Sequence, residues 1–204
     1  NSNHYELSVS KKPENLDIVY EVDDVRIINI MANEKYVVWS EYSSGKLSYI
    51  YYDKEENQTY ELTSLPYNKK EPQVANIGLY KDKIYYEIID YENKNVSLNV
   101  YDIPKNEIGT LYKLNIHEID LPYNTLNVEE NNLLISICYN RVLQIIHFNL
   151  DKYMDKNYKP KVINANLYNS IPFSVSYNNN EYALYYRHNI KENISIINKN
   201  GKII

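Results

Sequence analysis

The 204-residue chain contains a single cysteine, Cys138, and only four glycines. One thiol cannot form an intrachain disulfide, so the usual inference of cellular compartment from cysteine content is uninformative. Cys138 lies in the apolar run LLISICYN, where a small buried side chain is expected rather than a reactive thiol. Since glycine is scarce, we expect asparagine, which tolerates left-handed backbone, to occupy many turn positions.

An excess of basic residues is also absent. The chain carries 22 Lys and Arg against 27 Asp and Glu, for a net charge of −5. Binding to nucleic acid depends largely on Lys and Arg that neutralise phosphates, so the sequence predicts no nucleic-acid partner. No apolar run approaches the roughly 18 residues of a spanning helix. We therefore expect membrane attachment only through an N-terminal anchor outside the given sequence.

Tyrosine replaces the other aromatic residues. The chain has 24 Tyr, two Phe and one Trp. Tyrosine is favoured on pleated, half-buried strands, where its ring packs and its hydroxyl reaches water or a polar partner. The composition therefore favours an all-β chain, and its richness in Asn, Lys, Ile and Tyr is typical of an AT-rich bacterial genome.

A strand motif recurs four times along the chain. YVVWSEY, IYYEIID, LLISICY and YALYYRH begin at Tyr36, Ile84, Leu133 and Tyr182, at steps of 48, 49 and 49 residues. A fixed period of this length built from strands is typical of β-propeller blades. Each unit divides into four strand-like segments joined by short polar links. We predict an all-β fold, a β-propeller-like array of about four four-stranded antiparallel blades.

The third and fourth segments of each unit have distinct signatures. The third segments end at Asp53, Asp102, Asn149 and Asn198, where an Asx side chain can start a turn by accepting a backbone hydrogen bond. The fourth segments are polar and irregular, as expected of outer edge strands. The stretch LDKYMDK at 150–156 is interpreted as part of a long loop in preference to one helical turn.

The chain is predicted to consist of a polar tether at 1–15 and one domain at 16–204. The segment 16–22, LDIVYEV, resembles an outer strand without a unit of its own. It either joins the last unit and closes a ring, or belongs to a preceding blade. The predicted repeat units cover residues 24–65, 72–118, 124–165 and 171–204.

Residues 39–63, WSEYSSGKLSYIYYDKEENQTYELT, resemble the strands of TolB-like propellers: a strand ending near Trp, a Tyr-rich strand, an Asp turn and a final LT. Residues 88–116 keep the Tyr-Asp turn without the Trp and the final Thr, and residues 132–163 keep only the apolar pattern. The resemblance implies a rigid docking surface or an accessory domain beside an enzyme, in a family whose members usually have six to eight blades. Four units would form a four-bladed ring, a half-ring that associates as a homo-oligomer, or part of a larger protein.

The sequence contains no GxSxG elbow, Walker loop, HExxH or EF-hand spacing. We expect no cofactor and no metal site, because the histidines are not paired at ligand spacing and His147 is most simply a packed or edge residue. Acidic pairs, Glu129-Glu130 among them, are interpreted as solvated turns, because adjacent strand residues point to opposite faces. The four histidines are His4, His117, His147 and His188.

Paired tyrosines are the best candidates for a binding surface. Tyr51-Tyr52, Tyr85-Tyr86 and Tyr185-Tyr186 supply both faces of their strands with aromatic surface, mostly for packing between blades. An exposed minority could stack on sugars or anchor a protein. The predicted rim-binding residues are Tyr185, Tyr186, Arg187 and His188.

The sequence predicts a non-catalytic binding or scaffolding propeller module of a bacterial extracytoplasmic protein, in the cell envelope or secreted, with a protein or glycan as partner. The repeat, the polar residues 1–15 and the absence of catalytic motifs motivate this hypothesis. The alternative is a fragment or accessory domain of a propeller-containing hydrolase, such as a glycoside hydrolase or an oligopeptidase.

Overall fold

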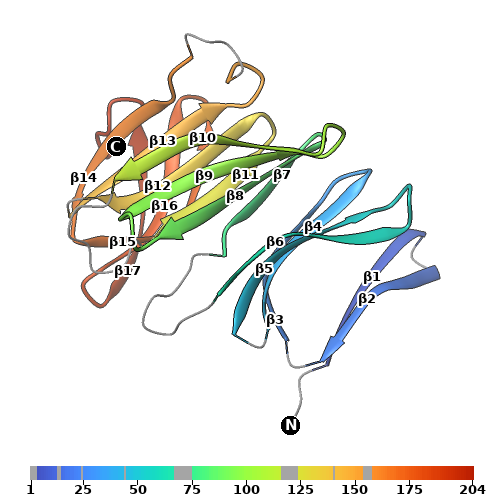
Figure 1. Cartoon of the computed structure of the whole chain (residues 1–204). Helices are drawn as coiled ribbons and strands as arrows, with labels where there is room; N and C mark the ends of the chain where they lie inside the picture. Colours follow the sequence, from blue (N-terminus) through green and yellow to red (C-terminus); the bar gives the residue numbers. More distant parts are fainter. Residues whose placement is uncertain are drawn as a thin grey trace. The chain divides into compact units, whose positions relative to one another are not determined.

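The computed structural model describes residues 4–12, 15–23, 25–43, 45–66, 75–115, 124–139, 141–153 and 158–204. Every regular element in these ranges is a β-strand (Figure 1), which confirms the all-β prediction. None of the described segments is a helix long and apolar enough to cross a bilayer. Two compact units divide the chain: Asn1–Ile88 with Asn99–Gly109, and Ile89–Leu98 with Thr110–Ile204.

The chain begins with a two-stranded antiparallel hairpin. β1 (His4–Lys12) pairs with β2 (Asn15–Asp23), and the register places Leu7 opposite Tyr20. The interpretation of this N-terminal segment as a tether is therefore wrong for β1. The sequence HYELSVSKK alternates apolar and polar residues, a strand pattern that its overall polarity obscures.

β2 contains the segment 16–22, whose role the sequence leaves open. Its hydrogen-bonded partner is β1. This pairing agrees with a partial blade that precedes the first full unit, and it offers no support for an outer strand of the last unit. The predicted boundaries of the repeat units remain predictions.

Three four-stranded sheets follow, and in each the strands are neighbours in chain order. Within each sheet most strands are joined to the next by a link of two to four residues, a length typical of antiparallel neighbours, whereas residues 150–160 separate β13 from β14. The first sheet contains β3 (Val25–Ala32), β4 (Tyr36–Ser43), β5 (Lys46–Asp53) and β6 (Gln58–Pro66). The second contains β7 (Ile77–Tyr80), β8 (Lys83–Asp90), β9 (Asn95–Asp102) and β10 (Glu107–Asn115). The third contains β11 (Asn124–Glu129), β12 (Asn132–Tyr139), β13 (Val142–Asn149) and β14 (Lys161–Tyr168).

The last sheet has three strands: β15 (Ser170–Asn178), β16 (Glu181–His188) and β17 (Lys191–Asn198). Beyond β17, Ile203 forms a single antiparallel bridge with Ile197, on the side where an outer strand lies in the other three sheets. The four successive sheets are blades of a β-propeller-like array, as predicted.

The third strands of the four sheets end at the predicted Asx residues. Asp53, Asn149 and Asn198 each accept a hydrogen bond through Oδ1 from the backbone nitrogen two residues on, over 2.8, 3.2 and 2.9 Å. The carboxylate of Asp102 instead pairs with two lysines, and these contacts lower its pKa. Three of the four predicted Asx turns are thus present.

Asparagine also occupies the left-handed turn positions. Eleven described residues other than glycine have positive φ, and seven of them are asparagine. The short polar side chain of asparagine makes this conformation less costly than for most residues. The chain therefore forms its tight turns with few glycines, as the composition predicts.

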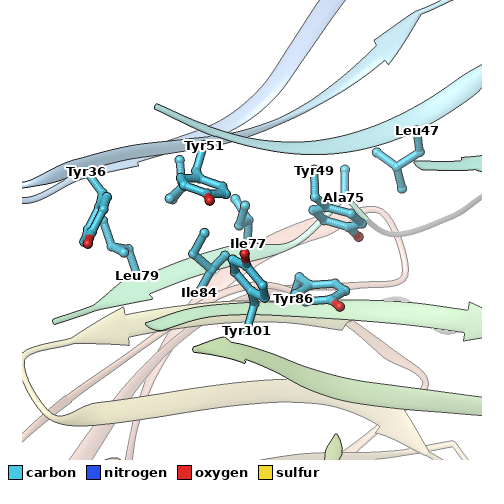
Figure 2. Packing of buried hydrophobic residues seen from close by; sticks show 11 residues of the cluster. Tyr36, Leu47, Tyr49, Tyr51, Ala75, Ile77, Leu79, Ile84, Tyr86 and Tyr101 are labelled. Atoms are coloured by element: carbon cyan, nitrogen blue, oxygen red, sulfur yellow. The ribbon is translucent and has the colours of Figure 1, made fainter. Parts of the chain in front are cut away.

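Packing between sheets supplies the core of the first unit. Side chains of β4 and β5 meet those of β7, β8 and β9 in one cluster (Figure 2). Tyr49 is fully buried there, and its hydroxyl donates to the carbonyl oxygen of Glu87 over 2.6 Å. The opposite face of the first sheet is also buried, since Trp39 packs against Tyr20 of β2 with ring centroids 4.9 Å apart.

A second cluster forms the core of the second unit. Leu134, Leu143 and Ile145 of the third sheet pack against Tyr182 and Leu184 of the last sheet. Burying one such aliphatic side chain contributes about 1.5–3 kcal/mol relative to leaving it exposed. Both clusters join one sheet to the next along the chain.

The register corrects the alignment of the repeats by one residue. Tyr36 lies opposite Asp53, whereas Glu181 lies opposite Asn198. The motif aligns Tyr36 with Tyr182, but the register shows that Tyr36 corresponds to Glu181. A strand that is buried on both faces carries apolar residues at both parities, so its sequence matches almost equally well after a one-residue shift.

Candidate docking surface on the last sheet

The four predicted binding residues follow one another on β16, so they alternate between its two faces. Tyr185 is 36% exposed and Arg187 is half-buried on the same face. Tyr186 is only 6% exposed. The structure thus divides the predicted set between a surface and a core.

Tyr186 belongs to the core, so its assignment to a binding rim is corrected. It packs in the cluster between the third and last sheets, and its hydroxyl lies 3.2 Å from Oγ of Ser195. The motif YYRH does not show which tyrosine is buried, because either Tyr185 or Tyr186 could face the preceding sheet.

His188 is exposed at the end of β16. Its Nδ1 lies 3.1 Å from the carbonyl oxygen of Tyr168 and 3.3 Å from Oγ of Ser170. These contacts hold the ring against the start of β15. His188 therefore lies at the border of the candidate surface.

An aromatic and charged cluster surrounds Tyr185. The ring centroid of Phe173 lies 5.2 Å from that of Tyr185, and the Arg187 guanidinium lies 4.9 Å from the Phe173 centroid. Glu192 of β17 accepts a hydrogen bond from the Tyr185 hydroxyl over 2.5 Å and pairs with Arg187 over 3.3 Å. These contacts raise the pKa of Tyr185 and lower the pKa of Glu192. The cluster is preorganised, because each polar group already has a partner.

Two isoleucines that the sequence analysis missed extend this surface. Ile194 is 74% exposed and Ile196 is 36% exposed. The register places Ile194 opposite Tyr185 and Ile196 opposite Ala183. The alternation in KENISIIN could have indicated them, since every second residue of a strand shares a face.

We define these side chains together as the last-sheet face. The face is mostly apolar and aromatic, and its two charged side chains neutralise one another. Such a surface is typical of a docking site and not of a catalytic one. Within the described ranges, no three His, Cys, Asp or Glu side chains are grouped to hold a metal ion. The last-sheet face consists of Phe173, Ala183, Tyr185, Arg187, Glu192, Ile194 and Ile196.

Two other polar residues have structural partners. His147 is half-buried, with Nδ1 2.9 Å from the Tyr182 hydroxyl and Nε2 2.8 Å from Oδ1 of Asn132, so it is a packed residue as predicted. Glu129 is not a solvated turn residue: its Oε2 accepts hydrogen bonds from Ser176 Oγ over 3.0 Å and from the Tyr177 nitrogen over 3.1 Å. The interpretation of Glu129 is therefore wrong, because β11 brings it against the inner strand of the next sheet.

Cys138 is half-buried on β12. Burial raises the pKa of its thiol. Since the thiolate is the reactive form, this environment agrees with the predicted unreactive side chain.

No family model and no curated protein matches the chain. Solved structures do match. Sqt1 of Saccharomyces cerevisiae shares 13% identity, and the match covers 99% of this chain and 55% of that chain with a TM-score of 0.55. A chain of a nidogen–laminin complex shares 14%, with 83% and 58% covered and a TM-score of 0.51. Prolyl oligopeptidase B from Galerina marginata shares 14%, with 90% and 27% covered and a TM-score of 0.51.

These neighbours are propeller proteins, and at such identities the likeness is one of fold. TolB from Acinetobacter baumannii is also among the matches, at 12% identity and a TM-score of 0.49. The chain resembles a TolB-like propeller loosely, as residues 39–63 indicate. It spans less than two thirds of the length of each of these chains.

Proposed function

We propose that this chain is a non-catalytic binding or scaffolding propeller module that docks a protein or glycan on the last-sheet face. The observation that carries the proposal is the exposure of Tyr185 and Ile194 beside the ion pair of Arg187 and Glu192. Tyrosine and arginine are enriched among the residues that dominate binding energy in interfaces. Their mutual contacts also reduce the side-chain entropy that binding would cost.

The proposal includes a place in the envelope of a bacterial cell or outside it. The richness in Asn, Lys, Ile and Tyr supports the bacterial origin. Protease accessibility of the chain in intact cells, compared with lysed cells, tests this location. The location would be contradicted if the chain resisted the protease in cells whose outer layer had been opened while the cytoplasmic membrane stayed intact.

Binding is tested by comparing the wild-type chain with Tyr185→Ala and a control, Ile108→Ala. Ile108 is an exposed isoleucine of β10 that lies outside the last-sheet face. We expect the wild type and the control to bind a member of a defined glycan array, or to cross-link through a photoreactive residue at position 194 to a protein of a bacterial envelope extract. The Tyr185 variant should lose most of this signal.

Absence of glycan binding, together with absence of cross-linking to any protein, a second copy of the chain included, would contradict the docking function. Turnover of any substrate in a broad hydrolase screen, abolished by changing one exposed carboxylate, would contradict the non-catalytic role.

A second candidate is a part of a propeller-containing hydrolase. It is motivated by the match of 90% of this chain to 27% of prolyl oligopeptidase B, which leaves most of that protein outside the likeness. A native open reading frame that joins this chain to a catalytic domain would favour this candidate.

A further inference from the structure

We propose that the occupant of the last-sheet face is the same face of a second copy of the chain, in a twofold dimer. This inference rests on the proposed docking function and names its partner.

The strand positions shared with the earlier sheets indicate what kind of surface fits the last-sheet face. Ile194 and Ile196 lie four and two residues before the Asx residue that ends β17, as Tyr49 and Tyr51 lie before Asp53 in the first sheet. Tyr49 and Tyr51 pack against the second sheet. In the third sheet Ile145 holds the same position as Ile194 and packs against the last sheet. The last-sheet face is therefore the face on which earlier blades receive the apolar face of another sheet.

The opposite faces of the four blade sheets are already buried. Trp39, Tyr86, Ile135 and Leu184 hold corresponding positions on the second strands and are each at most 2% exposed. Ten large hydrophobic side chains of the described residues are exposed, and three of them lie together on the last-sheet face. Among the four blade sheets, the surface that a second copy can offer is thus its own last-sheet face.

Cross-strand pairing makes this face complementary to itself. Arg187 lies opposite Glu192, and Tyr185 lies opposite Ile194. We place the twofold axis parallel to the strands, between the two facing sheets and midway between β16 and β17. It sets β16 of one copy over β17 of the other. Arg187 of one copy then faces Glu192 of the other, and each Tyr185 faces an Ile194.

The charges permit this contact. Glu192 carries two carboxylate oxygens with several acceptor sites, so it can accept from the guanidinium of the second copy while it retains its own hydrogen bond from Tyr185. Since Arg187 and Glu192 neutralise one another within a copy, two identical faces meet without net repulsion. Twofold, self-complementary contacts are the commonest symmetry of soluble oligomers.

The face is small, with seven residues, whereas a standard interface has about 20–30 residues on each side. We therefore expect a weak dimer with a dissociation constant in the micromolar range, on the order of 10–100 µM. Its population should depend on protein concentration.

Sedimentation equilibrium of the full chain from about 5 to 200 µM tests the proposal. The weight-average mass should rise from the monomer value of 24.2 kDa toward twice that value. Ile194→Lys should weaken association at least about tenfold, because a charge would enter an apolar contact. The control Ile108→Lys, on β10, should associate like the wild type.

A charge exchange tests the specific pairing. Arg187→Glu gives a face with two acidic residues, and Glu192→Arg gives one with two basic residues, so each variant alone should remain monomeric. An equimolar mixture should form a heterodimer, in which every acidic side chain faces a basic one. Far-ultraviolet circular dichroism checks that each variant is folded.

A wild-type chain that stays monomeric at the highest concentration would overturn the proposal, as would association that Ile194→Lys leaves unchanged. If the chain stays monomeric but still cross-links through position 194 to another protein, the dimer is contradicted and the docking function is not. Failure of the mixed charge variants to associate would overturn the pairing of Arg187 with Glu192.

Discussion

At the scale of single residues, polar groups inside the sheets are held by specific partners. Glu41 is only 5% exposed, and its two carboxylate oxygens each lie 2.9 Å from a donor, the Tyr20 hydroxyl and the Trp39 Nε1. Burying a polar group without such partners costs several kcal/mol. These contacts explain how acidic and histidine side chains are accommodated within apolar runs.

His147 illustrates the consequence for pH. Oδ1 of Asn132 only accepts, so Nε2 of the neutral ring donates to it and Nδ1 accepts from the Tyr182 hydroxyl. Burial lowers the pKa of His147, and the charge of Lys161 lowers it further. The neutral ring is therefore the form that the folded chain favours.

We predict that stability decreases below neutral pH because of His147. Its pKa is lower in the folded chain than the ordinary value of 6.5, so the unfolded chain binds more protons as the pH falls through that value. The stabilisation is complete above pH 6.5 and is lost as the pH falls toward the folded pKa. Urea unfolding at pH 7.5 and 5.5 should show this loss, and His147→Gln should reduce the difference.

His188→Gln is the matched control, since it removes an exposed histidine at the end of β16. An unchanged pH dependence in His147→Gln would contradict the assignment.

At the scale of elements, the turns after the third strands depend on side-chain acceptors. Oδ1 of Asp53 accepts hydrogen bonds from the backbone nitrogens of Glu55 and Glu56, over 2.8 and 3.0 Å. The turn connects β5 to the outer strand β6, and the register of that pair begins at Asp53 with Gln58. The side chain thus helps to fix where the outer strand begins.

Asp53→Ala should lower the free energy of unfolding by about 1 kcal/mol, because a typical net hydrogen bond contributes about 0.5–1.5 kcal/mol. Asp53→Asn retains the oxygen acceptor and should cost less than half as much. Chemical denaturation of the three proteins measures this difference. Equal losses in both variants would indicate that the charge, and not the acceptor, stabilises the turn.

At the scale of the whole molecule, each unit has its own core between consecutive sheets. Middle strands have two hydrogen-bonded neighbours and buried side chains, whereas β6, β10 and β14 are outer strands with mostly exposed or half-buried residues. In repeat architectures, stability arises largely from such contacts between neighbouring repeats.

We predict that amide hydrogen exchange follows this order. Amides of β4, β5, β12 and β13 should exchange the most slowly, and those of β14 should exchange at least about tenfold faster than those of β13, because outer strands open at lower free-energy cost. Exchange followed by mass spectrometry of peptic peptides measures the protection. Equal protection of β13 and β14 would contradict an outer position for β14.

The repeat and the strand ends were predictable because they depend on local chemistry. Asp53, Asn149 and Asn198 end strands since their side chains bond the backbone that follows. The distinction between Tyr185 and Tyr186 was not predictable, because both residues are tyrosine and the motif YALYYRH has apolar or aromatic residues at both parities, so it does not say which face is covered. The alternation in KENISIIN places Ile194 and Ile196 on one face of β17, but whether another sheet covers that face depends on tertiary packing.

The amino-acid sequence by itself determined that the chain is all-β, that its unit recurs about every 49 residues, and that asparagine and aspartate shape its turns. These properties follow from composition and from contacts between residues close in sequence. Only the tertiary structure decided the register of each repeat and the side of β16 that remains exposed. Those properties depend on which sheet covers which face, and that is set by packing between residues far apart in the chain.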